Sequence, residues 1–172
     1  MNDEDKIFMD TNLWVYLYVK SPEAKYQKVK QIVNTHFRQI VVSTQILGEL
    51  YHVLTRKSLQ SNEKAKEIVI ETIAHFPVSE MTALNVVTAL DIHDKYKYSY
   101  WDSLLIATAL LNHFPYLYSE DMQHNQLIEN KTRIINPFLL SFRTYSYFQK
   151  ACVHVETRVS RLCLAFQHRV IL

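Results

Sequence analysis

Short apolar segments alternate with longer segments of helical periodicity through most of the chain, and this alternation constrains the fold more than any other feature. The apolar segments at residues 6–9, 39–42, 116–118 and 133–135, with a possible fifth around 76–78, have the length of buried strands. Helices are predicted over residues 13–19, 22–37, 44–57, 62–75, 81–96 and 101–113. Strands that alternate with helices form a parallel sheet covered on both faces. The sequence therefore predicts an α/β fold that binds its ligands outside the carboxyl ends of the strands.

The glycine content excludes two common classes of phosphate-binding site. Gly48 is the only glycine among 172 residues. Walker A loops and dinucleotide-binding fingerprints need several residues without a Cβ atom. A nucleotide-binding protein of either class is therefore ruled out.

The charge is distributed unevenly along the chain. Residues 1–138 hold 14 Lys and Arg against 16 Asp and Glu, a net charge of −2, and residues 139–172 hold 5 against 1, a net charge of +4. The main body of the chain is thus not basic overall. A nucleic acid would have to bind there through local basic groups or bound cations.

No segment of the sequence is long and apolar enough to span a membrane. The longest apolar stretch, residues 104–111, falls far short of the ~20 residues that a span requires. The amino terminus is acidic and polar, unlike a secretory signal, and we expect a cytoplasmic protein. Cys152 and Cys163 form no CxxC pair and have no histidines at zinc-finger spacing, so they indicate neither a disulfide framework nor a zinc site.

Three aspartates occupy positions that are compatible with either a structural or a functional role. Asp10 follows the first predicted strand and, with Thr11 and Asn12, is suited to capping the next helix. Asp102 lies in the first turn of a predicted helix, where a carboxylate complements the helix dipole, and Asp121 follows a strand at a position typical of turns. Taken singly, each aspartate is explained more readily by its structural role.

Glu49 is harder to explain structurally. It falls on the margin of the apolar stripe that Ile46, Leu50, Val53 and Leu54 form on the same predicted helix, and no Lys or Arg lies within one turn of it. Burial of an unpaired carboxylate costs several kcal/mol, so such a group normally has a cationic partner or binds a metal. Glu49 is therefore the strongest single indication of a functional site.

The predicted sheet would bring these four carboxylates together, with Asp10 and Asp121 at strand ends and Glu49 and Asp102 on adjacent helices. A hard divalent cation such as Mg²⁺, which prefers oxygen ligands and keeps several waters, would neutralise their repulsion. Such an ion orients a phosphate oxygen and lowers the pKa of an attacking water, and a second ion can assist at the leaving oxygen. The residue types thus indicate metal-dependent hydrolysis of a phosphodiester without a covalent nucleophile.

Four short motifs occur in the order found in one nuclease family. They are Met9-Asp10-Thr11-Asn12, Gly48-Glu49-Leu50, Tyr100-Trp101-Asp102-Ser103 and Ser119-Glu120-Asp121, and Ile135-Asn136-Pro137-Phe138 follows them. In this succession, on these predicted elements, residues 5–138 resemble a PIN-domain ribonuclease, specifically the VapC-type toxin of a toxin–antitoxin pair.

This resemblance implies a three-layer α/β/α sandwich and an endoribonuclease that acts on RNA with Mg²⁺ or Mn²⁺. It also implies frequent formation of a homodimer and inhibition by a cognate antitoxin that occupies the site. Residue by residue, it assigns the catalytic metal to four carboxylates and a supporting role to two polar side chains: Asp10, Glu49, Asp102 and Asp121, with Asn12 and Ser119.

Four aromatic residues close to the third motif have two interpretations. Tyr96, Tyr98, Tyr100 and Trp101 could stack on unpaired bases, since aromatic side chains form platforms for single-stranded nucleic acid. Packing is the more usual role for large aromatics that flank a buried helix. We therefore expect packing for these four residues.

Three further polar residues near the motifs are not assigned to the site. Arg56 and Lys57 could contact RNA phosphates, but a solvated helix end that complements its dipole explains them equally well. His124, three residues after Asp121, is interpreted as a surface or packing residue.

Two other functions are alternatives to a ribonuclease for this sequence. A phosphatase of the aspartyl-nucleophile type also begins with Asp after a strand, but it needs a second Asp two residues on, where this chain has Asn12. A non-catalytic interaction module that kept the PIN fold stays open. It predicts that the folded protein binds no divalent cation.

The sequence changes in character after Phe138, and toxins of this kind usually lack the segment that follows. Apolar residues recur at spacings of three and four between Phe148 and Val170, which predicts a helix over about residues 145–170 with one apolar stripe to bury. An accidental or poorly ordered extension is the alternative. We predict a nuclease domain over residues 1–140 and an extension over residues 141–172 that the domain does not need for folding or activity.

Overall fold

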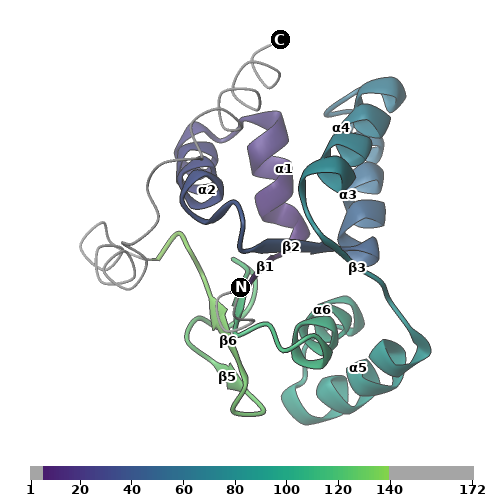
Figure 1. Cartoon of the computed structure of the whole chain (residues 1–172), viewed down its shortest axis with the longest axis vertical. Helices are drawn as coiled ribbons and strands as arrows, with labels where there is room; N and C mark the ends of the chain where they lie inside the picture. Colours follow the sequence, from purple (N-terminus) through teal and green to yellow (C-terminus); the bar gives the residue numbers. More distant parts are fainter. Residues whose placement is uncertain (1–5, 140–172) are drawn as a thin grey trace. The chain divides into compact units, whose positions relative to one another are not determined.

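Residues 6–139 of the chain are described by the computed structural model (Figure 1). One structural unit ends at Pro137. The helix predicted over residues 145–170 and both cysteines lie outside the described residues. Among the helices of residues 6–139, none has the length and apolar character needed to cross a membrane.

Six strands form a single sheet. In chain order they are β1 (Ile7–Met9), β2 (Ile40–Ser43), β3 (Val78–Ser79), β4 (Tyr116–Tyr118), β5 (Leu127–Ile128) and β6 (Thr132–Ile135). Their order across the sheet is β3-β2-β1-β4-β6-β5. Neighbouring strands are parallel except for β5, which is antiparallel to β6. The predicted parallel sheet is confirmed, with one antiparallel edge strand that the sequence did not reveal.

Six helices cover the sheet in two layers. They are α1 (Thr11–Val19), α2 (Glu23–His36), α3 (Thr44–Arg56), α4 (Asn62–His75), α5 (Ala83–Tyr96) and α6 (Tyr100–Leu111). Helices α1 to α4 lie on one side of the sheet and α5 and α6 on the other (Figure 1). The contacts agree, because α1 packs on α2 and α3, α3 packs on α4, and α5 packs on α6. The three-layer α/β/α arrangement is therefore confirmed.

The two helix layers follow from the order in which strands join the sheet. From β1 the chain adds β2 and β3 in one direction, and it then returns to place β4 on the other side of β1. Crossovers between parallel strands are right-handed in nearly all proteins, so connections that run in opposite directions place their helices on opposite faces. The direction changes between β1 and β4, where sheets of this kind open a crevice for ligands.

The strand and helix ends near this crevice are held by specific local contacts. The side chain of Ser43, at the N-cap of α3, accepts a hydrogen bond from the backbone N–H of Ile46. Trp14 of α1 is fully buried, and its indole N–H donates to the carbonyl oxygen of Met9 at 3.2 Å. The helix expected from residue 81 begins instead at Ala83, because Thr82 and Asn85 form a capping box there. Helices α1 and α3 are thus anchored beside the strand ends from which they start.

Candidate active site

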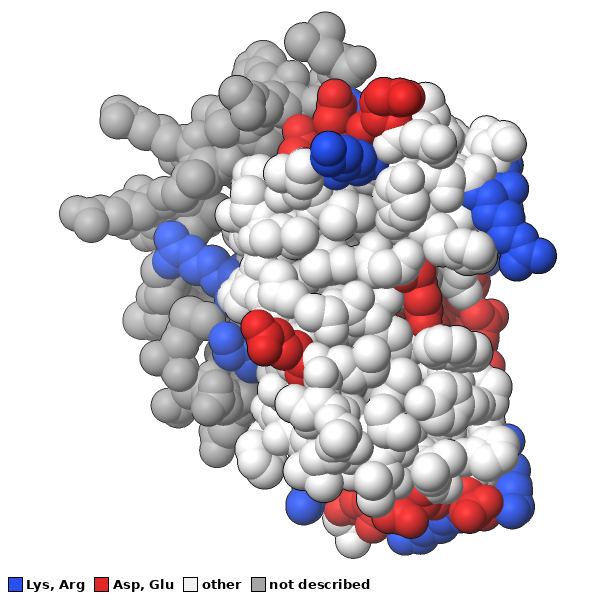
Figure 2. Space-filling view, turned by 90° about the vertical axis from the view of Figure 1, so that its right-hand side faces the viewer, with Lys and Arg blue, Asp and Glu red and all other residues white. Residues whose placement is uncertain are grey.

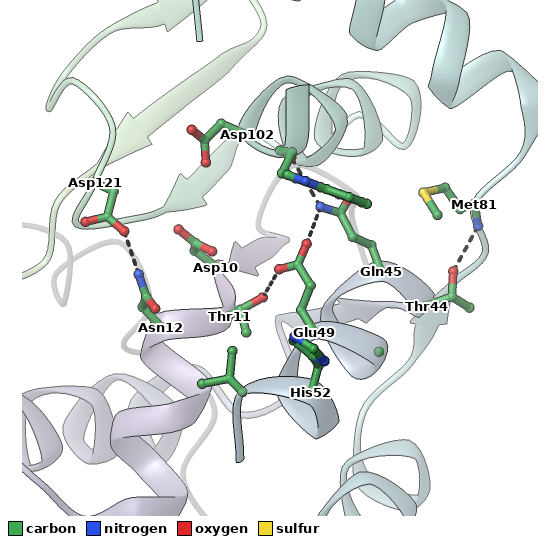
Figure 3. A pocket seen from close by; sticks show the side chains of 13 residues that line it. Asp10, Thr11, Asn12, Thr44, Gln45, Glu49, His52, Met81, Asp102 and Asp121 are labelled. Carbon is green, nitrogen blue, oxygen red and sulfur yellow. Dashed lines mark hydrogen bonds between the residues drawn. The ribbon is translucent and has the colours of Figure 1, made fainter. Parts of the chain in front are cut away.

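A pocket of about 650 Å³ opens where β1 and β4 end and where α3 and α6 begin (Figure 3). The structure brings all four predicted carboxylates to its wall: Asp10, Glu49, Asp102 and Asp121. Of the two predicted supporting residues, Asn12 lines the pocket and Ser119 is fully buried beside Asp10. Residues up to 111 positions apart therefore meet at the crevice between β1 and β4.

The pairing of β1 with β4 sets the position of Asp10. Met9 lies opposite Tyr118 in the parallel register, and the backbone N–H of Asp10 donates to the carbonyl oxygen of Tyr118 at 2.9 Å. Asp10 therefore lies beside Ser119, whose hydroxyl donates to Oδ2 of Asp10 at 2.7 Å. Asp10 occupies the N-cap position of α1, but its side chain makes no capping hydrogen bond. Side-chain capping, the ordinary explanation for Asp10, is therefore wrong.

The environment of Asp10 disfavours its negative charge. Burial raises the pKa of this carboxyl from 3.8 to about 6, and repulsion by Asp102 and Glu49 acts in the same direction. The hydrogen bonds from Ser119 and from the backbone of Thr11 oppose this change in pKa. The Asp10 carboxylate is thus repelled by two of the other three carboxylates, and a bound cation would relieve this repulsion.

Glu49 is held by two neutral side chains from different parts of the chain. The hydroxyl of Thr11 donates to its Oε2 at 2.6 Å, and Nε2 of Gln45 donates to its Oε1 at 2.9 Å. Gln45 also donates to the backbone carbonyl oxygen of Trp101 at 3.2 Å, which links α3 to the first turn of α6. The half-buried Glu49 therefore has hydrogen-bond donors but no cationic partner among residues 6–139, as its sequence environment suggested.

Asp102 and Asp121 also accept hydrogen bonds from neutral groups. The hydroxyl of Ser99 donates to Oδ2 of Asp102 at 2.7 Å and accepts from its backbone N–H, so Asp102 does help to form the start of α6. Nδ2 of Asn12 donates to Oδ2 of Asp121 at 2.5 Å. Structural and functional roles are thus compatible at Asp102, and Asn12 positions the most exposed of the four carboxylates.

The chemistry of this donor set fits a hard divalent cation. Residues 6–139 contribute no Lys or Arg to the pocket wall, and the ion pairs among them involve none of the four carboxylates. In the same part of the chain, no three Asp, Glu, His or Cys side chains lie close enough together to form a complete metal centre. Magnesium and manganese accept such sparse sites, because they take few protein ligands and fill the remaining positions with water and substrate oxygens.

A second network, which the sequence analysis missed, holds the loop between Ser119 and Asp121. Glu120 accepts hydrogen bonds from the hydroxyl of Tyr16 on α1 and from Nζ of Lys25 on α2. The side chain of Asn136 donates to the backbone carbonyl oxygen of Glu120 at 3.1 Å. These contacts tie the loop to two helices and to the end of β6, and they restrict where the Asp121 carboxylate can lie.

The aromatic residues near α6 divide into two groups. The hydroxyls of Tyr96 and Tyr98 form hydrogen bonds with Glu129 and Gln126, and Tyr100 packs against a buried cluster under α5 and α6. Packing, which we expected for all four aromatics, is therefore found for Tyr100, whereas Tyr96 and Tyr98 are half-buried and held by these hydrogen bonds. It is wrong for Trp101, which is 61% exposed and lines the pocket.

The remaining polar candidates lie outside the pocket wall. Arg56 and Lys57 are exposed at the end of α3 and do not line the pocket. Nδ1 of His124 accepts a hydrogen bond from the backbone N–H of Asn136 at 3.0 Å, which gives this histidine a packing role.

Sequence reasoning missed Thr11, Gln45 and Trp101 as parts of the site. Gln45 lies four residues before Glu49, a helical spacing that brings two side chains together and could have been recognised. The contact of Thr11 with Glu49 spans 38 positions and has no local signal.

Comparison with known proteins adds a family to this fold. The family model of the PIN domain matches residues 7–129, and no curated protein matches the chain. A toxin–antitoxin complex from Klebsiella pneumoniae is similar in structure, with a TM-score of 0.59, 15% identity, and coverage of 78% of this chain and 100% of the other. VapC20 from Mycobacterium tuberculosis, described as a sarcin–ricin loop cleaving toxin, gives a TM-score of 0.56 at 19% identity, with 65% and 87% covered. VapBC2 from Rickettsia felis, solved with a DNA fragment from its promoter, gives 0.56 at 15% identity, with 76% and 98% covered.

At such low identities the solved structures show a shared fold, whereas the family model covers more than half of the sequence. The matched residues contain all four acidic motifs in full, and in the structure all four motifs meet at one crevice. On these grounds the chain belongs to the PIN domain family.

Proposed function

We propose that this protein is a metal-dependent endoribonuclease that hydrolyses phosphodiester bonds of RNA with Mg²⁺ or Mn²⁺. One observation carries the proposal: four carboxylates line a single pocket to which residues 6–139 contribute no Lys or Arg. Asp10, Glu49, Asp102 and Asp121 would hold the cation, and Asn12 and Ser119 would orient Asp121 and Asp10.

Each residue then has a distinct part in the chemistry. When bound, the cation supplies a more acidic water and neutralises charge that develops on the phosphate. Ser119 and Thr11 supply hydrogen bonds that keep the oxygens of Asp10 and Glu49 aimed from β1 and α3, so that little reorganisation is needed when substrate binds. The part of the chain that the structure describes places no Cys or Lys nucleophile in the pocket wall, which is consistent with direct attack by water.

The decisive experiment is incubation of the purified full chain with mixed RNAs in Mg²⁺, in Mn²⁺ and in excess chelator. We expect cleavage only with a metal ion, and products that carry 5′-phosphates, because an activated water attacks the phosphorus and the 3′ oxygen leaves. Cleavage in chelator, or products with cyclic phosphates, would contradict metal-dependent hydrolysis. A folded protein that binds neither ion by calorimetry would favour the non-catalytic PIN-fold module instead.

We further propose that the protein is the toxin of a toxin–antitoxin pair. Support comes from the fold that it shares with toxin–antitoxin complexes and from the absence of Lys and Arg in the pocket wall, which leaves the carboxylates open to a basic residue of an antitoxin. Expression of the chain without a partner is expected to arrest bacterial growth, and Glu49→Gln should relieve the arrest. Growth equal to that of cells with an empty vector would count against the toxin role.

A homodimer is the assembly that we propose for this toxin. The side of the molecule formed by α4 and α5 is mainly uncharged, with Lys and Arg gathered near its edges (Figure 2). Exposed apolar residues on these two helices include Ile70, Ile73, Leu84, Val87 and Leu90. An apolar surface of this kind is typical of a protein interface.

A further inference from the structure

The pocket has a second part that the proposed metal chemistry does not use. Figure 3 shows Asp10, Asp102 and Asp121 toward one side, Thr44, Gln45 and Met81 toward the other, and Glu49 between them. Trp101 lines the same pocket, and its backbone carbonyl accepts the hydrogen bond from Gln45. This second part presents two exposed apolar side chains to a ligand, because Trp101 is 61% exposed and Met81 is 39% exposed.

Trp101 is held in place without being buried. Its ring contacts Tyr100 edge-on, with 5.4 Å between ring centroids, and Tyr100 itself packs against the cluster of Ala89, Leu104 and Ala107. The backbone of Trp101 is part of the first turn of α6. The indole is therefore an exposed aromatic surface on a rigid support, immediately before the proposed metal ligand Asp102.

The pocket wall at Gly48 leaves free space. Gly48 on α3 lines the pocket, and a Cβ atom built at this position would meet no other atom within 4 Å. The space in front of Gly48 is thus open, beside the carboxylate of Glu49.

We propose that Trp101 is the stacking platform of a base subsite, which binds one unpaired nucleobase of the RNA next to the phosphodiester held at the carboxylates. This subsite rests on the proposed ribonuclease function and extends it to substrate recognition. The acidic pocket repels a polyanion and residues 1–138 carry a net charge of −2, so that RNA binding needs contacts that do not depend on charge in addition to any bound cations. Stacking on an aromatic ring meets this need, and it tolerates any base because every base has a π-face.

An exposed tryptophan is also common in protein interfaces. Position favours the RNA, because Trp101 shares one pocket with the four carboxylates, whereas the exposed Ile70, Leu84 and Leu90 do not line it. Trp101 therefore continues the proposed active site, and an interface at this residue is one outcome of the test.

The test compares RNA substrates that are identical except for one abasic nucleotide, moved in steps along the strand on both sides of the cleaved bond. With the full-length wild type, we expect an abasic nucleotide at one position to lower kcat/KM roughly 5- to 100-fold, the effect of losing one stacked base. Trp101→Ala should lower kcat/KM on the intact RNA by a similar factor. With this variant, the abasic nucleotide at that position should cause no further decrease in kcat/KM. Trp101→Tyr should retain most activity, and Leu127→Ala, a change at an exposed residue of β5 outside the pocket, should retain all of it.

The subsite would be overturned if the fold-losses in kcat/KM from Trp101→Ala and from the abasic nucleotide multiplied when combined. That result would show that the base and the indole act independently. A changed oligomeric state of Trp101→Ala in sedimentation, with an unchanged abasic profile, would overturn it in favour of an interface.

Tryptophan fluorescence separates the subsite from the nuclease activity. The chain has two tryptophans, of which Trp14 is fully buried and Trp101 is exposed. In an Asp10→Asn background, which leaves RNA uncut, a single-stranded RNA hexamer should quench the emission of Trp101, and the additional change Trp101→Phe should remove this response. If RNA quenches the fluorescence but the wild type cuts no RNA, the result would support the subsite and contradict the nuclease. Cleavage by the wild type without quenching or an abasic effect would support the nuclease and overturn the subsite.

Discussion

Replacement of Asp10 by asparagine will reduce metal-dependent RNA cleavage by roughly 10³-fold or more, because a metal ligand acts through a charge that asparagine lacks. The fold should survive this change. Asparagine suits an N-cap position as well as aspartate does, and the Asp10 side chain makes no capping bond to α1. Its amide oxygen can still accept the hydrogen bond from Ser119.

Cleavage rates and circular dichroism on the same preparation check this prediction. Asp91→Asn is the matched control, because Asp91 is exposed on α5 and does not line the pocket, and it should leave the rate unchanged. Undiminished cleavage by the folded Asp10→Asn protein would remove Asp10 from the proposed metal site.

The metal-free wild type is expected to lose stability as the pH rises from about 4 to above 6, whereas Asp10→Asn should not show this loss. The pKa of Asp10 is about 6 in the folded protein, against an ordinary value of 3.8. Below pH 3.8 the carboxyl is protonated in both the folded and the unfolded chain, and its contribution to stability is fully present. Between the two pKa values the unfolded chain ionises first, and the contribution is lost as the pH passes the folded value. The difference between the two pKa values corresponds to about 3 kcal/mol of unfolding free energy.

Urea denaturation of both proteins at several pH values, with chelator and then with Mn²⁺, measures this effect. The proposed Mn²⁺ site is the ionised one of the folded chain, so the ion should stabilise the wild type more at pH 7.5 than at pH 5 and should have little effect on Asp10→Asn, as expected from general linkage. Parallel pH profiles for the two metal-free proteins would contradict the raised pKa. An equal response of both proteins to Mn²⁺ would place the ion elsewhere.

The sequence by itself determined the architecture and the places from which the site is built. Buried parallel strands appear as continuous apolar runs, so β1, β2, β4 and β6 could be predicted from the sequence. The ends of β1 and β4, which Asp10 and Asp121 follow, could be predicted with them. The edge strand β5 was not visible, because Leu127–Ile128 has two residues, of which one is exposed, and this is too short for any period.

The tertiary structure alone decided how the site is connected and which aromatic residue it contains. The hydrogen bonds from Ser119 to Asp10 and from Thr11 to Glu49 join residues 109 and 38 positions apart, and such partners leave no periodic pattern in the sequence. The same holds for the Tyr16 and Lys25 contacts of Glu120. Sequence reasoning treated Tyr96, Tyr98, Tyr100 and Trp101 alike, because neighbouring aromatics have the same tendency to be buried. Their exposure depends on the direction in which each side chain leaves the backbone between the end of α5 and the first turn of α6. It also depends on what lies opposite, and both are set by packing between distant elements.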